Sequence, residues 1–97
     1  MTTYIMLGSW TEQGIHHVKD SPKRLDKAKS DLKAMDGDFK AFYMIMGGDD
    51  FIAVIEAPDD AIAARFALMM GSSGAVRTRT LKAFPEEAFR EIIKSLP

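Results

Sequence analysis

The sequence of 97 residues contains no cysteine. This absence excludes disulfide bonds, thiolate catalysis and metal centres with cysteine ligands. Because secreted domains of this size are often held together by disulfides, the absence also favours a cytoplasmic location. The first ten residues, MTTYIMLGSW, carry no basic residue and no long apolar run. We therefore expect no signal peptide.

A long hydrophobic run and an excess of one charge are also missing. No segment approaches the roughly 20 apolar residues that a membrane-spanning helix requires. The 13 Lys and Arg residues balance the 14 Asp and Glu residues, which gives a formal net charge of −1 at pH 7. Nucleic-acid-binding proteins usually show a basic excess or a basic stripe. We expect neither a membrane nor a nucleic acid as a partner.

What is present is typical of one globular domain spanning residues 1–97, with 46% hydrophobic and 28% charged residues. Hydrophobic periodicity and turn residues predict the order β-α-β-β-α-β-α. Strands are expected at residues 3–10, 39–46, 51–57 and 75–84. This order is typical of a ferredoxin-like α+β sandwich, in which two helices cover one face of a four-stranded antiparallel sheet. A C-terminal helix is added to it.

The expected helix boundaries follow from capping residues. Ser21 is suited to cap the first helix, with Pro22 at its first position. Gly37 is placed to end that helix in a left-handed conformation. The second helix is expected to end at Gly71, and the last helix to begin at Pro85.

The central hairpin is apolar on both faces apart from Glu56. With Gly48 and Asp49 as a two-residue loop, the expected facing pairs are Met46 with Phe51, Met44 with Ala53 and Phe42 with Ile55. A large exposed apolar patch is unusual on a soluble monomer. We therefore expect two chains to pair their sheets as a dimeric α/β barrel. The alternative is that the C-terminal helix covers this face.

Most of the chemically suggestive residues lie in SWTEQGIHHVKDSPKR, residues 9–24. One of His16 and His17 is a candidate general base, and a solvated loop histidine is the alternative. Trp10, Lys19 and Asp20 are expected to form the mouth of a ligand pocket together with these histidines. Their spacing supports no metal site, and no ligand set for a cofactor can be assembled.

Three residues outside this stretch complete the predicted site. Tyr43 and Glu56 share a face of the central hairpin and are placed deeper in the pocket. Glu56 needs a partner among apolar neighbours, and Arg77 and Arg79 are candidates. If the chain is an enzyme, Arg77 or Lys19 would stabilise developing negative charge on the substrate.

Several ordered motifs resemble the GYD domain family over nearly the whole chain. WTEQGIHHVKDSPKRLDKAK is similar to the end of the family's first strand and its first helix. FYMIMGGDDFIAVIEAPDD is similar to its central hairpin, and GAVRTRTLKAF to its last strand. Asp49 replaces the tyrosine of the G-x-Y-D turn that names the family. The resemblance implies a ferredoxin-like, dimeric α/β barrel chain and no particular reaction.

These observations favour a homo-oligomeric domain that binds a small, partly apolar organic ligand between its sheet and helices. Two alternatives remain open. One is a cofactor-free enzyme of the monooxygenase or isomerase type, acting on a compound with an acidic C–H bond. The other is a non-enzymatic assembly module whose paired sheets are its whole function.

Overall fold

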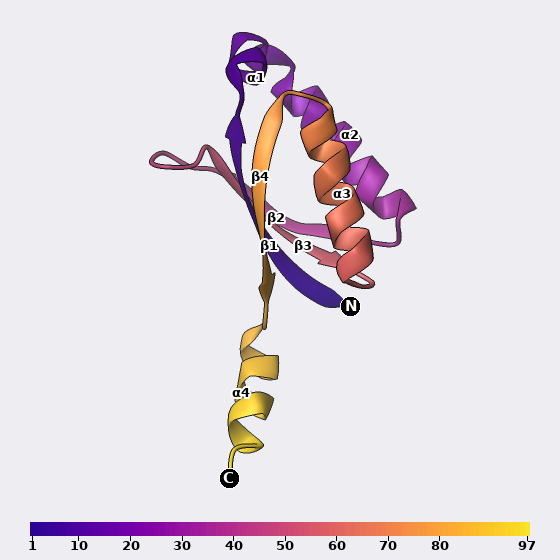
Figure 1. Cartoon of the computed structure of the whole chain (residues 1–97), viewed down its shortest axis with the longest axis vertical. Helices are drawn as coiled ribbons and strands as arrows, with labels where there is room; N and C mark the ends of the chain where they lie inside the picture. Colours follow the sequence, from indigo (N-terminus) through magenta and orange to yellow (C-terminus); the bar gives the residue numbers. More distant parts are fainter.

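The computed structural model describes residues 1–97. In chain order the elements are β1 (Thr2–Trp10), α1 (Glu12–His16), the 3₁₀ helix η1 (Val18–Asp20), α2 (Ser21–Ala34), β2 (Asp38–Met44), β3 (Phe51–Ala57), α3 (Asp60–Ser72), β4 (Val76–Ala83) and α4 (Glu86–Lys94). The strands form one antiparallel sheet in the order β2-β3-β1-β4. Helices α2 and α3 lie on one face of it (Figure 1). The predicted ferredoxin-like α+β arrangement is confirmed.

The hydrophobic core lies between this sheet and helices α2 and α3. Strands β1 and β3 alternate buried and half-buried residues, as expected for strands with one covered face. The largest fully buried side chains come from β1, β3 and the two helices: Met6, Leu32, Ile55 and Phe66. The helices are therefore held by side chains that project from alternate positions of the two central strands.

The hairpin register differs from the predicted one. Met44 lies opposite Phe51, and Phe42 lies opposite Ala53, so each pairing is shifted by two residues. The loop runs over residues 45–50 and is longer than the two residues expected. Because side chains alternate with a period of two, a shift of two residues leaves each side chain on its predicted face.

Two helix ends also correct the predictions. Asp20, not Ser21, is the N-cap of α2, and its side chain makes no capping hydrogen bond. The left-handed residue after this helix is Asp36, with φ 66°, rather than Gly37. Gly37 is required for another reason, because a Cβ there would collide with Leu32 and with the backbone oxygen of Glu56. Helix α3 continues beyond Gly71 to Ser72.

The second face of the sheet, called here the helix-free face, remains uncovered by the chain's own helices. Apolar residues contribute to it from three strands: Ile5, Leu7, Ile52, Val54 and Leu81. Helix α4 does not cover it but projects beyond the end of β4 (Figure 1). The predicted alternative, in which this helix covers the face, is therefore wrong.

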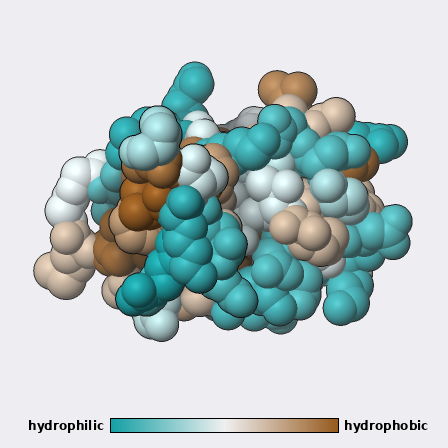
Figure 2. All heavy atoms as spheres, turned by 90° about the horizontal axis from the view of Figure 1, so that it is seen from below, coloured by the Kyte–Doolittle hydropathy of each residue, from teal (hydrophilic) through white to brown (hydrophobic).

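Helix α4 leaves its own apolar residues uncovered. Phe89, Ile92 and Ile93 are all exposed. Figure 2 views the molecule from the α4 end and shows hydrophobic residues there beside hydrophilic ones. The radius of gyration is 14.6 Å, larger than the roughly 12–13 Å expected for a compact domain of this length, in keeping with the projecting helix. None of the helices is long and apolar enough to cross a membrane.

Candidate functional site

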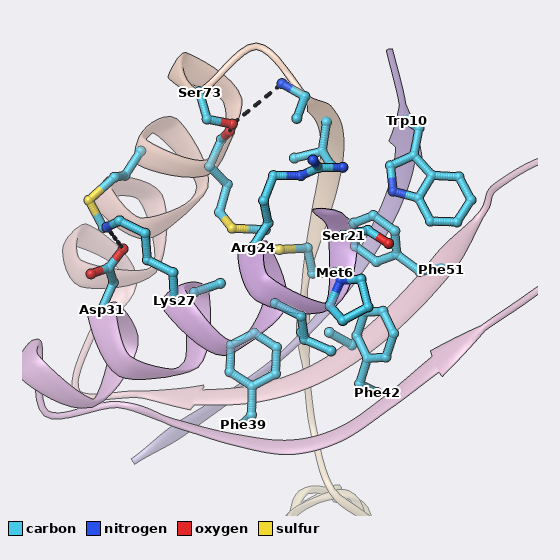
Figure 3. Close-up of a pocket in the computed structure, with 18 of the residues that line it drawn as sticks. Met6, Trp10, Ser21, Arg24, Lys27, Asp31, Phe39, Phe42, Phe51 and Ser73 are labelled. Carbon is cyan, nitrogen blue, oxygen red and sulfur yellow. Dashed lines mark hydrogen bonds and ion pairs between the residues drawn. The ribbon is translucent and has the colours of Figure 1, made fainter. Parts of the chain in front are cut away.

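A cavity of about 430 Å³, called here the α2–α3 pocket, lies between the sheet and helices α2 and α3. Of its 21 lining residues, 15 are hydrophobic. The sheet contributes Met6, Trp10, Phe42 and Phe51 among others (Figure 3). This volume and this largely apolar lining are typical of sites for small organic molecules.

Two aromatic rings form the sheet side of the pocket. Phe42 on β2 and Phe51 on β3 stack with centroids 5.4 Å apart and an interplanar angle of 28°. Phe51 extends over Gly8 on β1, so that a Cβ at position 8 would overlap the ring. The ring of Phe51 therefore fills the space that the missing side chain of Gly8 leaves.

The Trp10 end of the pocket is held against two neighbouring segments. The backbone N–H of Trp10 donates to the Asp50 carboxylate at 2.9 Å. The Thr11 N–H donates to the Ala75 carbonyl at 3.0 Å. Gly14 on α1 packs against the same carbonyl so closely that a side chain would not fit. These contacts fix the end of β1 against the hairpin and against the segment that leads into β4.

The charged groups of the pocket come from α2. Lys27 and Asp31 form an ion pair at 2.8 Å. Arg24 is partly buried and donates to the carbonyl oxygens of His17, at 3.2 Å, and of Gly14, at 3.4 Å. No carboxylate forms an ion pair with Arg24. Arg24 therefore has no acidic partner within the chain.

The residues predicted to form the pocket mouth are only partly brought together. Trp10 lines the α2–α3 pocket. His16 and His17 are exposed and meet edge to face, with centroids 5.0 Å apart. Lys19 and Asp20 are exposed on η1. None of these last four residues lines the pocket, and the roles assigned to them stay predictions.

Tyr43, Glu56 and Arg77 lie on the helix-free face, on the opposite side of the sheet from the pocket. In the strand register, Glu56 pairs with Thr3 and Arg77 pairs with Ser9. The predicted position of Tyr43 and Glu56 deep in the pocket is therefore wrong, and Arg77 does not line the pocket either. The functional roles assigned to these three residues stay predictions.

The ion pairs of this face also differ from the prediction. Glu56 pairs with Lys40 at 3.7 Å, whereas Arg79 pairs with Asp49 in the hairpin loop at 2.8 Å. Arg77 lies near the far end of β1 from Glu56. The expected contact between Glu56 and these arginines is therefore not formed within the chain.

A polar cluster that sequence reasoning missed joins β1, α3 and β4 at the end of the sheet away from Trp10. Tyr4 is buried and donates its hydroxyl to Asp60 at 2.5 Å, and Lys82 pairs with the same carboxylate at 3.1 Å. Burial, followed by the contact with Asp60, raises the pKa of Tyr4 to about 12. The Tyr4 hydroxyl and then Lys82 hold the pKa of Asp60 below its usual value.

Arg24 was also missed, although the sequence carries a signal for it. Ser21, Arg24 and Ala28 follow one another at helical spacing on α2, and all three line the pocket. A charged residue on the otherwise core-facing stripe of an amphipathic helix is unusual.

No group of three or more His, Asp or Glu side chains in the chain is placed to hold a metal ion.

Solved structures support the same fold. A feast or famine regulatory protein from M. tuberculosis, complexed with L-methionine, aligns with a TM-score of 0.67 and 12% identity. The alignment covers 88% of this chain and 51% of that one, so the chain spans about half the length of that structure. FFRP-DM1 aligns with a TM-score of 0.61 and 20% identity over 87% of this chain and 100% of its own. At these identities the likeness shows the fold alone.

Sequence comparison gives a closer relationship. A Thermus thermophilus protein named "Glutamine synthetase and cystathionine beta-lyase binding protein" is 36% identical over 86 residues, covering 88% of this chain and 90% of the relative. The GYD domain model matches residues 4–93, which include most of β1, the other three strands, α2 and α3, and most of α4. The resemblance noted in the sequence is confirmed, and the chain belongs to the GYD domain family.

Proposed function

We propose that this chain binds a small, largely apolar organic molecule in the α2–α3 pocket. The observation that carries the proposal is the pocket itself, with its volume of about 430 Å³ and its 15 hydrophobic lining residues. Apolar surface removed from water stabilises a complex by about 25 cal/mol per Å². A ligand that covers the rings of Trp10, Phe42 and Phe51 would gain most of its binding free energy in this way.

Binding without catalysis is the reading that the lining residues support best. The ionisable side chains of the pocket are Arg24, Lys27 and Asp31, and the last two neutralise each other. Neither histidine reaches the lining. A cofactor-free monooxygenase or isomerase would need a base facing the substrate, so that alternative has less support.

The test uses N-phenyl-1-naphthylamine, an uncharged aromatic probe that fluoresces in apolar surroundings and accepts energy from tryptophan. Trp10 is the only tryptophan and lines the pocket, so bound probe should quench its emission. Ala28→Phe introduces a ring into the pocket and should abolish the quenching. Ala64→Phe, on the exposed side of α3, is the matched control and should leave it unchanged. Equal binding by both variants would place the probe elsewhere and contradict the proposal.

We further propose that the chain forms a homodimer through the helix-free face, as a dimeric α/β barrel. Support comes from the apolar residues on three strands of that face, which the chain's own helices leave uncovered. A carboxylate in the centre of paired sheets would be buried without a partner. Val54→Asp should therefore yield monomers in light-scattering measurements, whereas Ala61→Asp, on the exposed side of α3, should not. A dimer that survives Val54→Asp rules out this interface.

A second candidate function is protein binding, supported by the name of the 36% identical relative and by α4. This helix presents exposed Phe89, Ile92 and Ile93 without a partner in the chain, a pattern used by helices that dock into grooves. Titration with purified glutamine synthetase and cystathionine beta-lyase tests this candidate. Ile93→Asp should weaken any complex, and Glu91→Gln on the same helix should leave it intact. Equal binding by both would exclude α4 as the docking element.

A further inference from the structure

We infer that the ligand of the α2–α3 pocket is an organic anion, an apolar body carrying one negatively charged group that Arg24 binds. The inference rests on the proposed small-molecule function and adds the chemical class of the ligand. It starts from the charge balance of the pocket. Lys27 is neutralised by Asp31 at 2.8 Å, whereas Arg24 has no acidic partner.

The position of Arg24 determines where a charged group of the ligand would bind. Its side chain reaches from α2 across the pocket, with Trp10 on one side and Ser73 on the other (Figure 3). The side chain is partly buried, so its charge is less well screened than that of a lysine on the open surface. A ligand lying on the aromatic rings would bring its polar end to this guanidinium.

The hydrogen bonds of Arg24 leave capacity for a ligand. A guanidinium has five N–H donors, and the carbonyls of Gly14 and His17 accept one bond each, at 3.4 and 3.2 Å. Both bonds are long compared with the usual 2.9–3.0 Å. A carboxylate, sulfonate or phosphate group would accept two parallel bonds from such a fork and would match its charge.

A purely structural role for Arg24 is the competing explanation. Its two carbonyl contacts connect α2 to α1 and η1, and they would contribute to folding without any ligand. Such a role predicts no preference for charged ligands. The two explanations therefore differ in ligand selectivity, whatever happens to stability.

The experiment compares two probes that share the same rings. 8-Anilinonaphthalene-1-sulfonate carries a negative sulfonate, and N-phenyl-1-naphthylamine is the same molecule without it. The measured quantity is the association constant of 8-anilinonaphthalene-1-sulfonate divided by that of N-phenyl-1-naphthylamine. This ratio is determined for the intact chain and for each variant. Because loss of folding weakens the binding of both probes together, this ratio isolates the effect of the probe's charge. Only binding that Ala28→Phe abolishes is counted, so probe bound to α4 or the helix-free face is excluded.

Arg24→Gln should lower the ratio by about tenfold or more, the effect of losing a hydrogen-bonded charge pair. Lys23→Gln changes the net charge equally at the neighbouring exposed position and should shift it less than about twofold. Arg24→Lys keeps the charge without the fork and should fall between them. A ratio unchanged in Arg24→Gln overturns the inference while leaving the pocket intact. If N-phenyl-1-naphthylamine binding is indifferent to Ala28→Phe, the proposed function itself fails.

Discussion

The ring of Phe51 lies directly over Gly8, and the absence of a side chain at Gly8 is what allows Phe51 to pack against β1. The two residues face each other in the antiparallel register of β1 and β3. Phe51 is buried, stacks on Phe42 and lines the α2–α3 pocket. The shape of the α2–α3 pocket therefore depends on a glycine in the adjacent strand.

Gly8→Ala should both destabilise the fold and reduce the volume of the α2–α3 pocket. The added methyl group overlaps the Phe51 ring, and insertion of a methyl into a packed region costs about 1–3 kcal/mol. Urea denaturation measures this cost. Gly48→Ala is the control, because nothing lies within 4 Å of a Cβ there. Equal stability of the two variants would mean that Phe51 moves aside freely.

Asp49 and Asp50 are neighbours with different expected contributions to stability. The Asp50 carboxylate accepts the Trp10 N–H at 2.9 Å, and its removal leaves that partly buried N–H unpaired. Asp50→Ala should therefore cost about 1–3 kcal/mol. Asp49 forms an ion pair with the exposed Arg79, so Asp49→Ala should cost at most about 1 kcal/mol. Thermal unfolding of both variants gives the comparison, and a larger loss for Asp49→Ala would contradict it.

The N-caps of α2 and α3 provide a second matched pair. Asp59 accepts the Ile62 N–H at 2.9 Å and caps α3, whereas Asp20 precedes α2 without any capping bond from its side chain. Asp59→Ala should lower the free energy of unfolding by about 0.5–2 kcal/mol. Asp20→Ala should change it by less than about 0.5 kcal/mol. Chemical denaturation distinguishes these outcomes, and similar losses would show that the cap bond contributes little.

The raised pKa of Tyr4 predicts a loss of folding stability at alkaline pH. Its pKa is raised to about 12 from 10.0, by burial and then by the hydrogen bond to Asp60. Between these two values the unfolded chain has released the phenolic proton and the folded chain has kept it, so stability falls as pH rises from 10 to 12. Absorbance titration of a Tyr43→Phe variant follows Tyr4 alone. Tyr4→Phe should flatten the pH dependence of stability in this interval, and an unaltered slope would exclude Tyr4 as its cause.

The order of the strands and of α2, α3 and α4 was predictable because each of these elements carries its own local pattern, whereas α1 and η1 were not predicted. The alternating residues of β3 and the Pro-initiated helices are visible in the sequence. The hairpin register was not, because GGDD marks a turn without fixing the length of its loop. Asp36 took the left-handed position expected of Gly37, and close packing of Gly37 on Leu32 is a tertiary contact that no local pattern reveals.

The candidate site was predicted less well than the fold. Trp10 lines the α2–α3 pocket, whereas Glu56 and Tyr43, which were grouped with it, lie on the other face of the sheet. The face of a residue on one strand relative to another depends on the register between β1 and β3, in which Glu56 pairs with Thr3. That register is set by long-range pairing and not by local sequence. The cytoplasmic location expected from the sequence stays a prediction.

The long loop between β2 and β3 offers a practical attachment point. Two backbone hydrogen bonds hold the base of the loop. The Ile45 N–H donates to the Asp50 carbonyl and the Asp50 N–H donates to the Gly8 carbonyl, both at 2.8 Å. Beyond this base Met46 is 94% exposed, and a Cβ added at Gly47 or Gly48 would meet no atom within 4 Å. Loop tips of this kind tolerate inserted segments. A fluorophore or tether introduced between Gly47 and Gly48 would therefore report on assembly while the sheet and the pocket keep their shape.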